Sequence, residues 1–313
     1  MTPRASTPAY RHALRDLRRG TAAAAVIGLF VNLLHLSMPL YTIQIYDRVI
    51  SSGSYETLVA LSGLVLVILV FQAVLDYLRH RIFAILGAQV AGRLGRDVFE
   101  ASVETTLRDG AAAAAGSMRD LGDLRAFIAS GAIALPLDLA MAPLFLSVLW
   151  LLHPIYGLVG LAAALMLSAI AVATEVLARR PTARATLASG NVHVETAAAI
   201  RNAEVITAMG MLPAVARRWR RSQAEALDSV ERRRATAKAL ASTAKAMRIG
   251  LQVAVLATGA ALVIQREASG GTIIAASVLI ARLLLPFEQM IEGWRQWVDA
   301  LAAGERLRDV LTR

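Results

Sequence analysis

"LVALSGLVLVILVFQAVLDYLRHRIFAILGAQVAGRLGRDVFEASVETT", residues 58–106, contains no proline, and its apolar first third passes into a charged remainder. In that remainder apolar residues still recur at every fourth position: Ile82, Leu86, Val90, Leu94 and Val98. This period is typical of a helix with one buried face. A helix of about 50 residues rises roughly 75 Å, and the hydrocarbon core of a bilayer is about 30 Å thick. We therefore expect one helix that crosses a membrane and projects about 45 Å beyond it.

Further apolar runs complete a set of six expected spans, at residues 22–45, 58–74, 135–152, 155–172, 251–264 and 272–285. The chain of 313 residues is 57% hydrophobic with a mean hydropathy of +0.55, whereas a soluble domain is about half apolar. The pair Arg18-Arg19 precedes the first run as in a signal peptide, but no small-residue cleavage site follows, so we expect an uncleaved first helix. The sequence thus predicts an all-α membrane protein in a lipid bilayer.

Composition argues against several other classes. The chain has no cysteine, and its five histidines are scattered without a metal-binding spacing, so we expect neither a disulfide framework nor a metal site. The net charge of +10 would suit a nucleic-acid-binding protein. Here the positive-inside rule explains that charge, and we expect no nucleic-acid partner.

Basic residues alternate between the connections. The segment before the first run carries five Arg against one acid, residues 79–125 carry seven Arg, and residues 175–248 carry fourteen Lys or Arg against six acids. The three short connections between the spans hold at most one Arg each. The positive-inside rule therefore places both termini and the two long excursions in the cytoplasm.

Both excursions are expected to be helical hairpins rather than ordinary solvated loops, because long loops without helix breakers are uncommon. The tips read "TLRDGAAAAAGSMRDLGDL", which begins beside Leu107, and "TAMGMLPAV". The second tip presents Met209, Met211, Leu212 and Pro213. Flexible apolar side chains of this kind suit a groove on another protein, although they could also pack on their own bundle.

Four ionisable residues fall inside the expected spans or, for Glu288, just beyond the apolar run of the sixth: His35, Asp138, Arg282 and Glu288. Such groups are costly in lipid, so they pair with one another or line a pathway. Counting about 1.5 Å per residue from the outer ends places Asp138, Arg282 and Glu288 at about 21, 15 and 24 Å. We expect either that Arg282 pairs with one of the two carboxylates or that these line a water-filled cavity, and that His35 is a hydrogen-bonded packing residue. Pro39, Pro136, Pro143 and Pro286 are expected to kink three spans.

Four stretches carry a resemblance to a known family: "MPLYTIQIYDRVISSGSYETL", "DLGDLRAFIASGAIALPLDLAMAPLFLSVLWLLHP", "RNAEVITAMGMLPAVARRW" and "IAASVLIARLLLPFEQMIEGWRQWVDA". In this order they resemble the transmembrane domain of ABC exporters, in the branch of type I protein secretion (the protease and haemophore exporters). The likeness covers nearly all of residues 20–313. It departs at Ala140 and Met141, where the family often has Pro-Trp, and this concerns the local shape of the third span.

The resemblance implies the type I ABC exporter fold, with residues 1–20 as a cytoplasmic tail, 21–303 as the six-helix domain and 304–313 as the start of a linker. It also implies coupling helices at residues 107–115 and 208–215, which dock on ATPase domains. Implied partners are a second copy of the chain, a periplasmic membrane-fusion adaptor, an outer-membrane tunnel protein and a secreted polypeptide cargo. The implied location is the bacterial inner membrane.

ATPase motifs are missing from the sequence. There is no GxxxxGK[ST], Gly-Lys does not occur, and the two lysines are Lys238 and Lys245. Since a phosphate-binding loop needs that Lys, we expect no cofactor on this chain, with ATP and Mg²⁺ held by a nucleotide-binding domain outside it. ATP hydrolysis is expected only together with that domain. Two alternatives stay open: an ABC exporter of lipid or small molecules, and a remnant without ATPase that acts as a membrane scaffold.

Overall fold

The computed structural model describes the backbone of residues 8–109 and 111–312, and every regular element within these ranges is a helix. In chain order the helices are α1 (Pro8–Leu34), α2 (Ser37–Ile43), the π-helix η1 (Gln44–Val49), α3 (Ile50–Ser52), α4 (Tyr55–Asp109), α5 (Ala111–Ala129), the 3-10 helix η2 (Ala132–Ala134), α6 (Leu135–Leu139), α7 (Ala142–Leu152), α8 (Pro154–Arg201), α9 (Ala203–Ala208), α10 (Leu212–Ile264) and α11 (Gly270–Thr312). The all-α prediction is confirmed.

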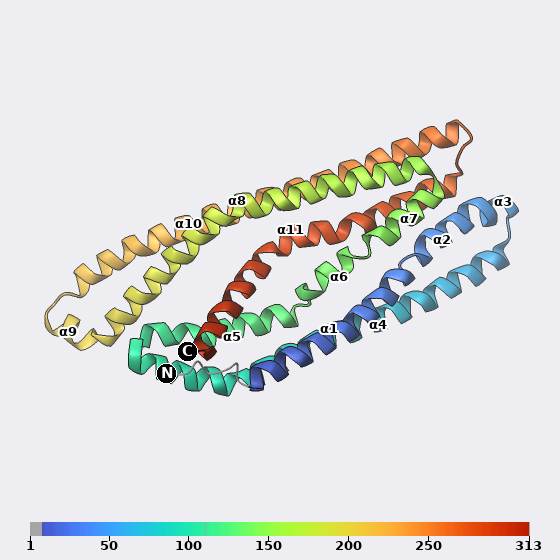
Figure 1. Ribbon diagram of the computed structural model, residues 1–313. Coiled ribbons are helices and arrows are strands. Elements are labelled where there is room, and N and C mark those ends of the chain that lie inside the picture. The colour runs from blue at the N-terminus through green and yellow to red at the C-terminus, as the bar shows by residue number, and fades with distance from the viewer. Residues whose placement is uncertain (1–7, 110, 313) are drawn as a thin grey trace.

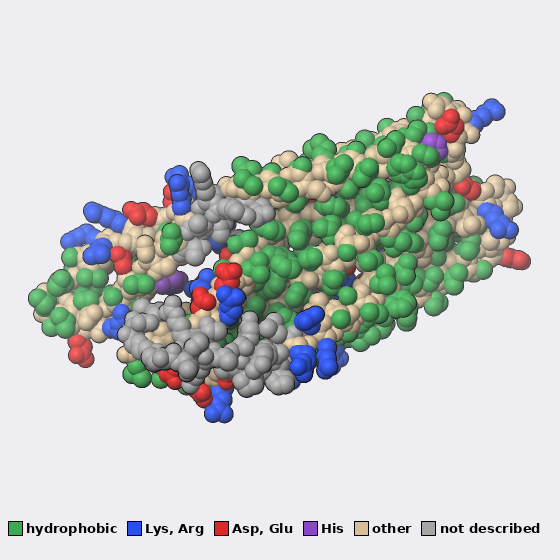
Figure 2. Space-filling view, in the orientation of Figure 1, with side chains coloured by type: hydrophobic (Ala, Val, Ile, Leu, Met, Phe, Trp, Pro, Cys, Tyr) green, Lys and Arg blue, Asp and Glu red, His purple; other side chains and the backbone are tan. Residues whose placement is uncertain are grey.

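Six segments are long and apolar enough to span a membrane: Arg15–Ser52, Tyr55–Leu107, Ala132–Leu152, Pro154–Thr174, Leu212–Ile264 and Gly270–Trp294. Each contains one of the six expected runs, so the six-span prediction is confirmed by length and composition. Large apolar side chains such as Leu66, Val67 and Val70 stand exposed on the outer face of α4, as lipid-facing residues do. Figure 2 shows apolar side chains over the middle of the molecule and charged ones gathered toward its ends.

The long helices run side by side and turn back at two ends (Figure 1). At one end, which we call the short-loop end, the turns lie at Gly53, His153 and residues 265–269. At the other, the charged end, α4 turns into α5 and α8 passes through α9 into α10. The 55 residues of α4 and the 53 of α10 each rise about 80 Å. The expected helical hairpins beyond the spans are therefore present.

Two apolar cores hold the helices together. At the charged end, Leu86, Val90, Leu94 and Val98 of α4 are buried against α1, α5 and α11, which confirms the four-residue period seen in the sequence. Toward the short-loop end, α7, α8, α10 and α11 share a second core around Leu149. The α8–α10 pair contacts the remaining helices mainly through α11. Its charged-end half also contacts α5, where Arg119 Nη1 lies 3.3 Å from His193 Nε2 of α8.

Proline interrupts the first and third spans. Pro39 has no N–H for the carbonyl of His35, and the chain turns at His35–Leu36 between α1 and α2. Pro143 likewise leaves the carbonyl of Leu139 without its helical donor, and α6 gives way to α7 at Ala140–Met141. The third span is thus two short helices rather than one kinked helix. In the sixth span Pro286 lies inside the continuous helix α11, which bends along its length (Figure 1).

Candidate functional site

The tip of the long α8–α10 hairpin is a short helix followed by a tight turn. Helix α9 ends at Ala208, and Gly210 takes a positive φ of 66° that reverses the chain. The Met211 N–H donates to the carbonyl of Ile206 (2.9 Å), as in a Schellman helix end. Pro213 then opens α10, where its missing N–H costs nothing. The expected coupling helix over residues 208–215 is therefore wrong in its bounds, because the short helix is Ala203–Ala208 and residues 209–211 form the turn.

Apolar side chains stand exposed on this tip. Their exposed fractions are 68% for Met209, 45% for Met211, 59% for Leu212 and 57% for Val205. Figure 2 shows the same apolar cluster at the far left, around α9 in Figure 1. Val205 was not predicted from the sequence, although its place in "RNAEVITAMGM", one helical turn before Met209, was a usable signal. We call Val205, Met209, Met211 and Leu212 the tip patch.

Contacts between α8 and α10 hold the tip patch in place. The indole N–H of Trp219 donates to Thr196 Oγ1 (2.8 Å), and Arg218 Nη2 lies 3.3 Å from Glu195 Oε1. Since these contacts fix the two helices close to the turn, the patch is presented on a braced support. The tip therefore holds a cluster of exposed apolar side chains, a feature that is typical of interaction surfaces.

The second tip lies between α4 and α5. Leu107 is 83% exposed at the end of α4. The remainder of the expected coupling segment, Gly110 and the side chains of residues 108–115, lies outside the described part of the chain. Behind this tip, Arg306 of α11 donates two hydrogen bonds to Asp120 of α5 (2.8 and 2.7 Å), and this bonding raises the pKa of the Arg306 guanidinium. The bidentate pair fastens the end of α11 to the first hairpin.

The two carboxylates considered for Arg282, those of Asp138 and Glu288, each have another arginine partner, which was not predicted from the sequence. Asp138 Oδ1 accepts from Arg79 Nη2 of α4 at 2.7 Å and from Asn32 Nδ2 of α1 at 3.3 Å. Glu288 Oε2 of α11 lies 2.5 Å from Arg248 Nε of α10. Arg79 and Glu288 are both buried, and a buried charge requires such a partner.

The expected pairing of Arg282 with Asp138 or Glu288 is wrong. Arg282 Nη1 lies 3.5 Å from His35 Nε2, and Gln72 Nε2 donates to His35 Nδ1 at 3.0 Å. His35, beside the break between α1 and α2, thus contacts polar side chains of α4 and α11. These contacts agree with the expected hydrogen-bonded packing role. The physical reason for the error is that helix rotation, and not depth alone, decides which charges meet.

A family model described as the ABC transporter transmembrane region matches residues 21–287. The type I secretion system ATP-binding protein PrsD of Rhizobium meliloti (strain 1021) is 35% identical over 304 residues, which make up 96% of this chain and 52% of that protein. The leukotoxin translocation ATP-binding protein LktB of Mannheimia haemolytica is 23% identical over 292 residues, 91% of this chain and 41% of that protein. The chain spans about half the length of these curated relatives.

A solved structure has the same fold. The structure of a bacterial Atm1-family ABC exporter with ATP bound superposes with a TM-score of 0.79 at 13% sequence identity, over 95% of this chain and 54% of that one. At this identity the likeness supports the fold alone. It agrees with six spans that continue into long helical hairpins at one end.

Proposed function

The chain belongs to the ABC transporter transmembrane-region family, and on that premise we propose that it forms the membrane-spanning half of an ATP-driven exporter for type I protein secretion. Two relatives support the class of cargo, since one is named for type I secretion and the other for leukotoxin translocation. In this proposal residues 21–303 form the transmembrane domain, with a tail before them and the start of a linker after them. The cargo is a secreted polypeptide.

The tip patch is the observation that carries the proposal. ATP hydrolysis can drive transport only if the conformational change of the ATPase domains is transmitted to the spans. Helices α8 and α10 are continuous from beside the tip into the spans. Exposed Met and Leu side chains fit a hydrophobic groove, as in other helix-in-groove contacts. We assign the tip around α9, together with the α4–α5 tip beside Leu107, to docking on ATPase domains.

Exposed apolar residues on the α8–α10 pair support a homodimer. The charged-end half of this pair contacts α5 through His193 and Arg119, yet it carries exposed apolar residues beyond the lipid-spanning part, including Leu187, Val194 and Leu227. A second copy of the chain would cover such residues. In this arrangement the two copies enclose the translocation pathway.

Orientation follows from charge. The charged end carries the basic excursions, so it faces the cytoplasm of a bacterial inner membrane with both termini, while the short-loop end faces outward. ATP and Mg²⁺ belong to the ATPase domains, because a phosphate-binding loop is missing from this sequence. At the short-loop end the proposed partners are a periplasmic membrane-fusion adaptor and an outer-membrane tunnel protein.

A capture experiment tests the coupling. The purified chain in lipid nanodiscs is immobilised, and the ATP-binding domain of the Rhizobium meliloti relative is added as the probe. Replacing both Met211 and Leu212 by Asp should lower its affinity more than tenfold, since central apolar anchors contribute about 2 kcal/mol or more each. Leu301→Asp is the matched control, because Leu301 is an exposed apolar residue of α11, away from the tip patch.

The outcomes separate the alternatives. Equal capture by wild type and the Met211→Asp, Leu212→Asp variant would show that the tip is not the docking element. Failure of the wild-type chain to capture the domain would favour a scaffold without ATPase coupling. If captured ATPase is stimulated by lipid or small molecules but not by an unfolded polypeptide, the chain exports those compounds instead.

A further inference from the structure

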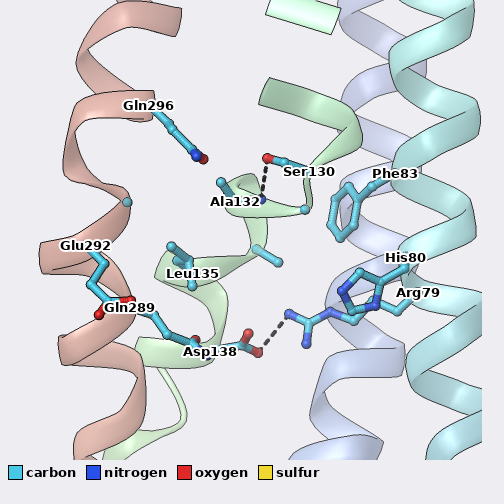
Figure 3. Close-up of a pocket in the computed structure, with 13 residues that line it drawn as sticks. Arg79, His80, Phe83, Ser130, Ala132, Leu135, Asp138, Gln289, Glu292 and Gln296 are labelled. Atoms are coloured by element: carbon cyan, nitrogen blue, oxygen red, sulfur yellow. Dashed lines mark hydrogen bonds and ion pairs between the residues drawn. The ribbon is translucent and has the colours of Figure 1, made fainter. Parts of the chain in front are cut away.

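A cavity of about 500 Å³ lies between α4, the α5–α6 segment and α11 (Figure 3). It sits at the charged-end boundary of the spans, because the third candidate span starts at Ala132 and the sixth ends at Trp294. Its volume falls within the range of about 300–1,000 Å³ that specific ligand sites occupy. Phe83, Leu135 and small alanines form its apolar part.

One wall of the cavity is a polar stripe on α11. Gln289, Glu292 and Gln296 follow one another at intervals of three and four residues, so they lie on one helix face. All three are exposed, and within the described residues none has a hydrogen bond or ion pair to another side chain. In Figure 3 they line the α11 side of the cavity, facing Asp138 and Ser130. Gly293 lies between them, where a Cβ would come within 3.4 Å of Leu135 Cδ1.

On the opposite wall of the cavity, Arg79 and Asp138 form an ion pair. Arg79 Nη2 lies 2.7 Å from Asp138 Oδ1, and the Arg79 side chain is 9% exposed. In this salt bridge the positive charge of Arg79 and the negative charge of Asp138 neutralise each other. Among the described lining residues, Glu292 therefore remains as the unneutralised charge, and this lining favours donors and cations over anions.

We infer that this cavity binds a short extended polypeptide segment and that Glu292 selects a basic side chain within it. The amide side chains of Gln289 and Gln296 each donate and accept, which matches the N–H and C=O groups of an extended backbone. From Gln289 to Gln296 the helix rises about 10 Å, the length of about three extended residues. The inference rests on the proposed function, in which the cargo is a polypeptide.

A photo-crosslinking experiment tests the site. A photoreactive amino acid replaces Gln296 in the full chain in nanodiscs, and in a control it replaces Leu301, which is exposed on α11 outside the cavity. The probes are biotinylated unstructured Gly-Ser peptides with one central Lys, one central Glu or neither. We expect capture at position 296 well above that at 301, with the Lys peptide preferred over the Glu peptide by up to about fivefold, as a part-exposed ion pair allows.

Matched variants assign the preference to one residue. Glu292→Gln should make Lys and Glu peptides equal without changing capture of the neutral peptide, whereas Glu305→Gln, a change at an exposed residue of α11 outside the cavity, should leave the preference intact. Gln289→Ala should weaken capture of all three peptides. The replaced side chains, Gln289, Glu292 and Glu305, are all exposed, so we expect the melting temperatures of the variants to equal that of the wild type. This measurement will show that the variants are folded.

Three results would overturn the inference: capture at 296 no higher than at 301, equal capture of both charged peptides by the wild-type lining, or a preference for the Glu peptide. The last would indicate an anionic ligand. None of these results bears on docking of the ATPase domain to the tip patch, so failure of this site and failure of the proposed function are distinguishable.

Discussion

Arg248 and Glu288 form an ion pair that joins α10 to α11 two residues after Pro286, with 2.5 Å between Nε and Oε2. Helix α10 begins at the tip patch, and α11 carries the polar stripe that starts at the next residue, Gln289. The pair therefore links the arm that bears the tip to the helix that lines the cavity.

Removal of Arg248 should destabilise the protein strongly. Arg248→Leu leaves the buried Glu288 without its partner, and breaking a buried pair in this way costs about 3–5 kcal/mol. The free energy of unfolding, measured by denaturant titration in detergent micelles with circular dichroism, should fall by an amount toward the lower end of that range, because Arg248 is 21% exposed. Adding Glu288→Gln should restore much of the loss.

The matched control is an exposed ion pair on the same helix. Arg232 Nη2 lies 2.9 Å from Asp228 Oδ2, and both side chains are more than half exposed. Arg232→Leu should cost no more than about 1 kcal/mol. If Arg248→Leu costs no more than this control, the buried pair is not a structural joint.

Arg79 should matter more than Arg282. Arg79→Leu removes the ion-pair partner of Asp138 and leaves Asn32 as its remaining described hydrogen-bond partner. The free energy of unfolding should fall by about 3–5 kcal/mol. Arg282→Leu loses a contact to His35 and should cost about 1 kcal/mol. The same unfolding titration ranks the two variants. A larger loss for Arg282→Leu would mean that it holds a carboxylate in the membrane-embedded protein.

The sequence predicted the spans and the long hairpins because the apolar runs and the four-residue period of residues 82–98 are local signals. It could not predict the ion pairs. Arg79 lies after the second expected run and Arg248 lies three residues before the fifth, so both were read as topology charges rather than as partners of Asp138 and Glu288. Such partners depend on how long helices rotate against one another, which is a property of packing and not of spacing.

The short helix at the tip shows the same limit on a smaller scale. Met and Pro residues marked the place, but the expected segment, residues 208–215, runs across Gly210, whereas the short helix comes before this glycine and ends at Ala208. A Gly in a helical pattern indicates a turn without giving its side. Pro39 and Pro143 predicted a disturbance of the helices near His35–Leu36 and Ala140–Met141. A proline does not indicate, however, whether a helix is kinked or interrupted.

Gly210→Ala should weaken the tip. A side chain at a φ of 66° costs about 1–2 kcal/mol, partly offset by the lower entropy of the unfolded chain. We expect faster hydrogen exchange in residues 203–211 by mass spectrometry, together with weaker capture of the ATP-binding domain. Gly190→Ala, in the interior of α8 with open space around the added Cβ, should instead stabilise the helix by about 0.5–1 kcal/mol. Equal effects of the two changes would contradict the turn.

The proposed orientation can be tested with single cysteines, because the chain has none of its own. Ser52→Cys and Gln265→Cys place exposed thiols at the short-loop end, and Met118→Cys and Arg221→Cys place them at the charged end. Ser117 would be a poor choice, since it is 4% exposed and a buried thiol stays unlabelled on either side. In intact cells an impermeant maleimide should label the first two positions, and the last two should react only after permeabilisation. Labelling of the Met118→Cys variant in intact cells would reverse the assignment, and with it the docking of cytoplasmic ATPase domains on the tip patch.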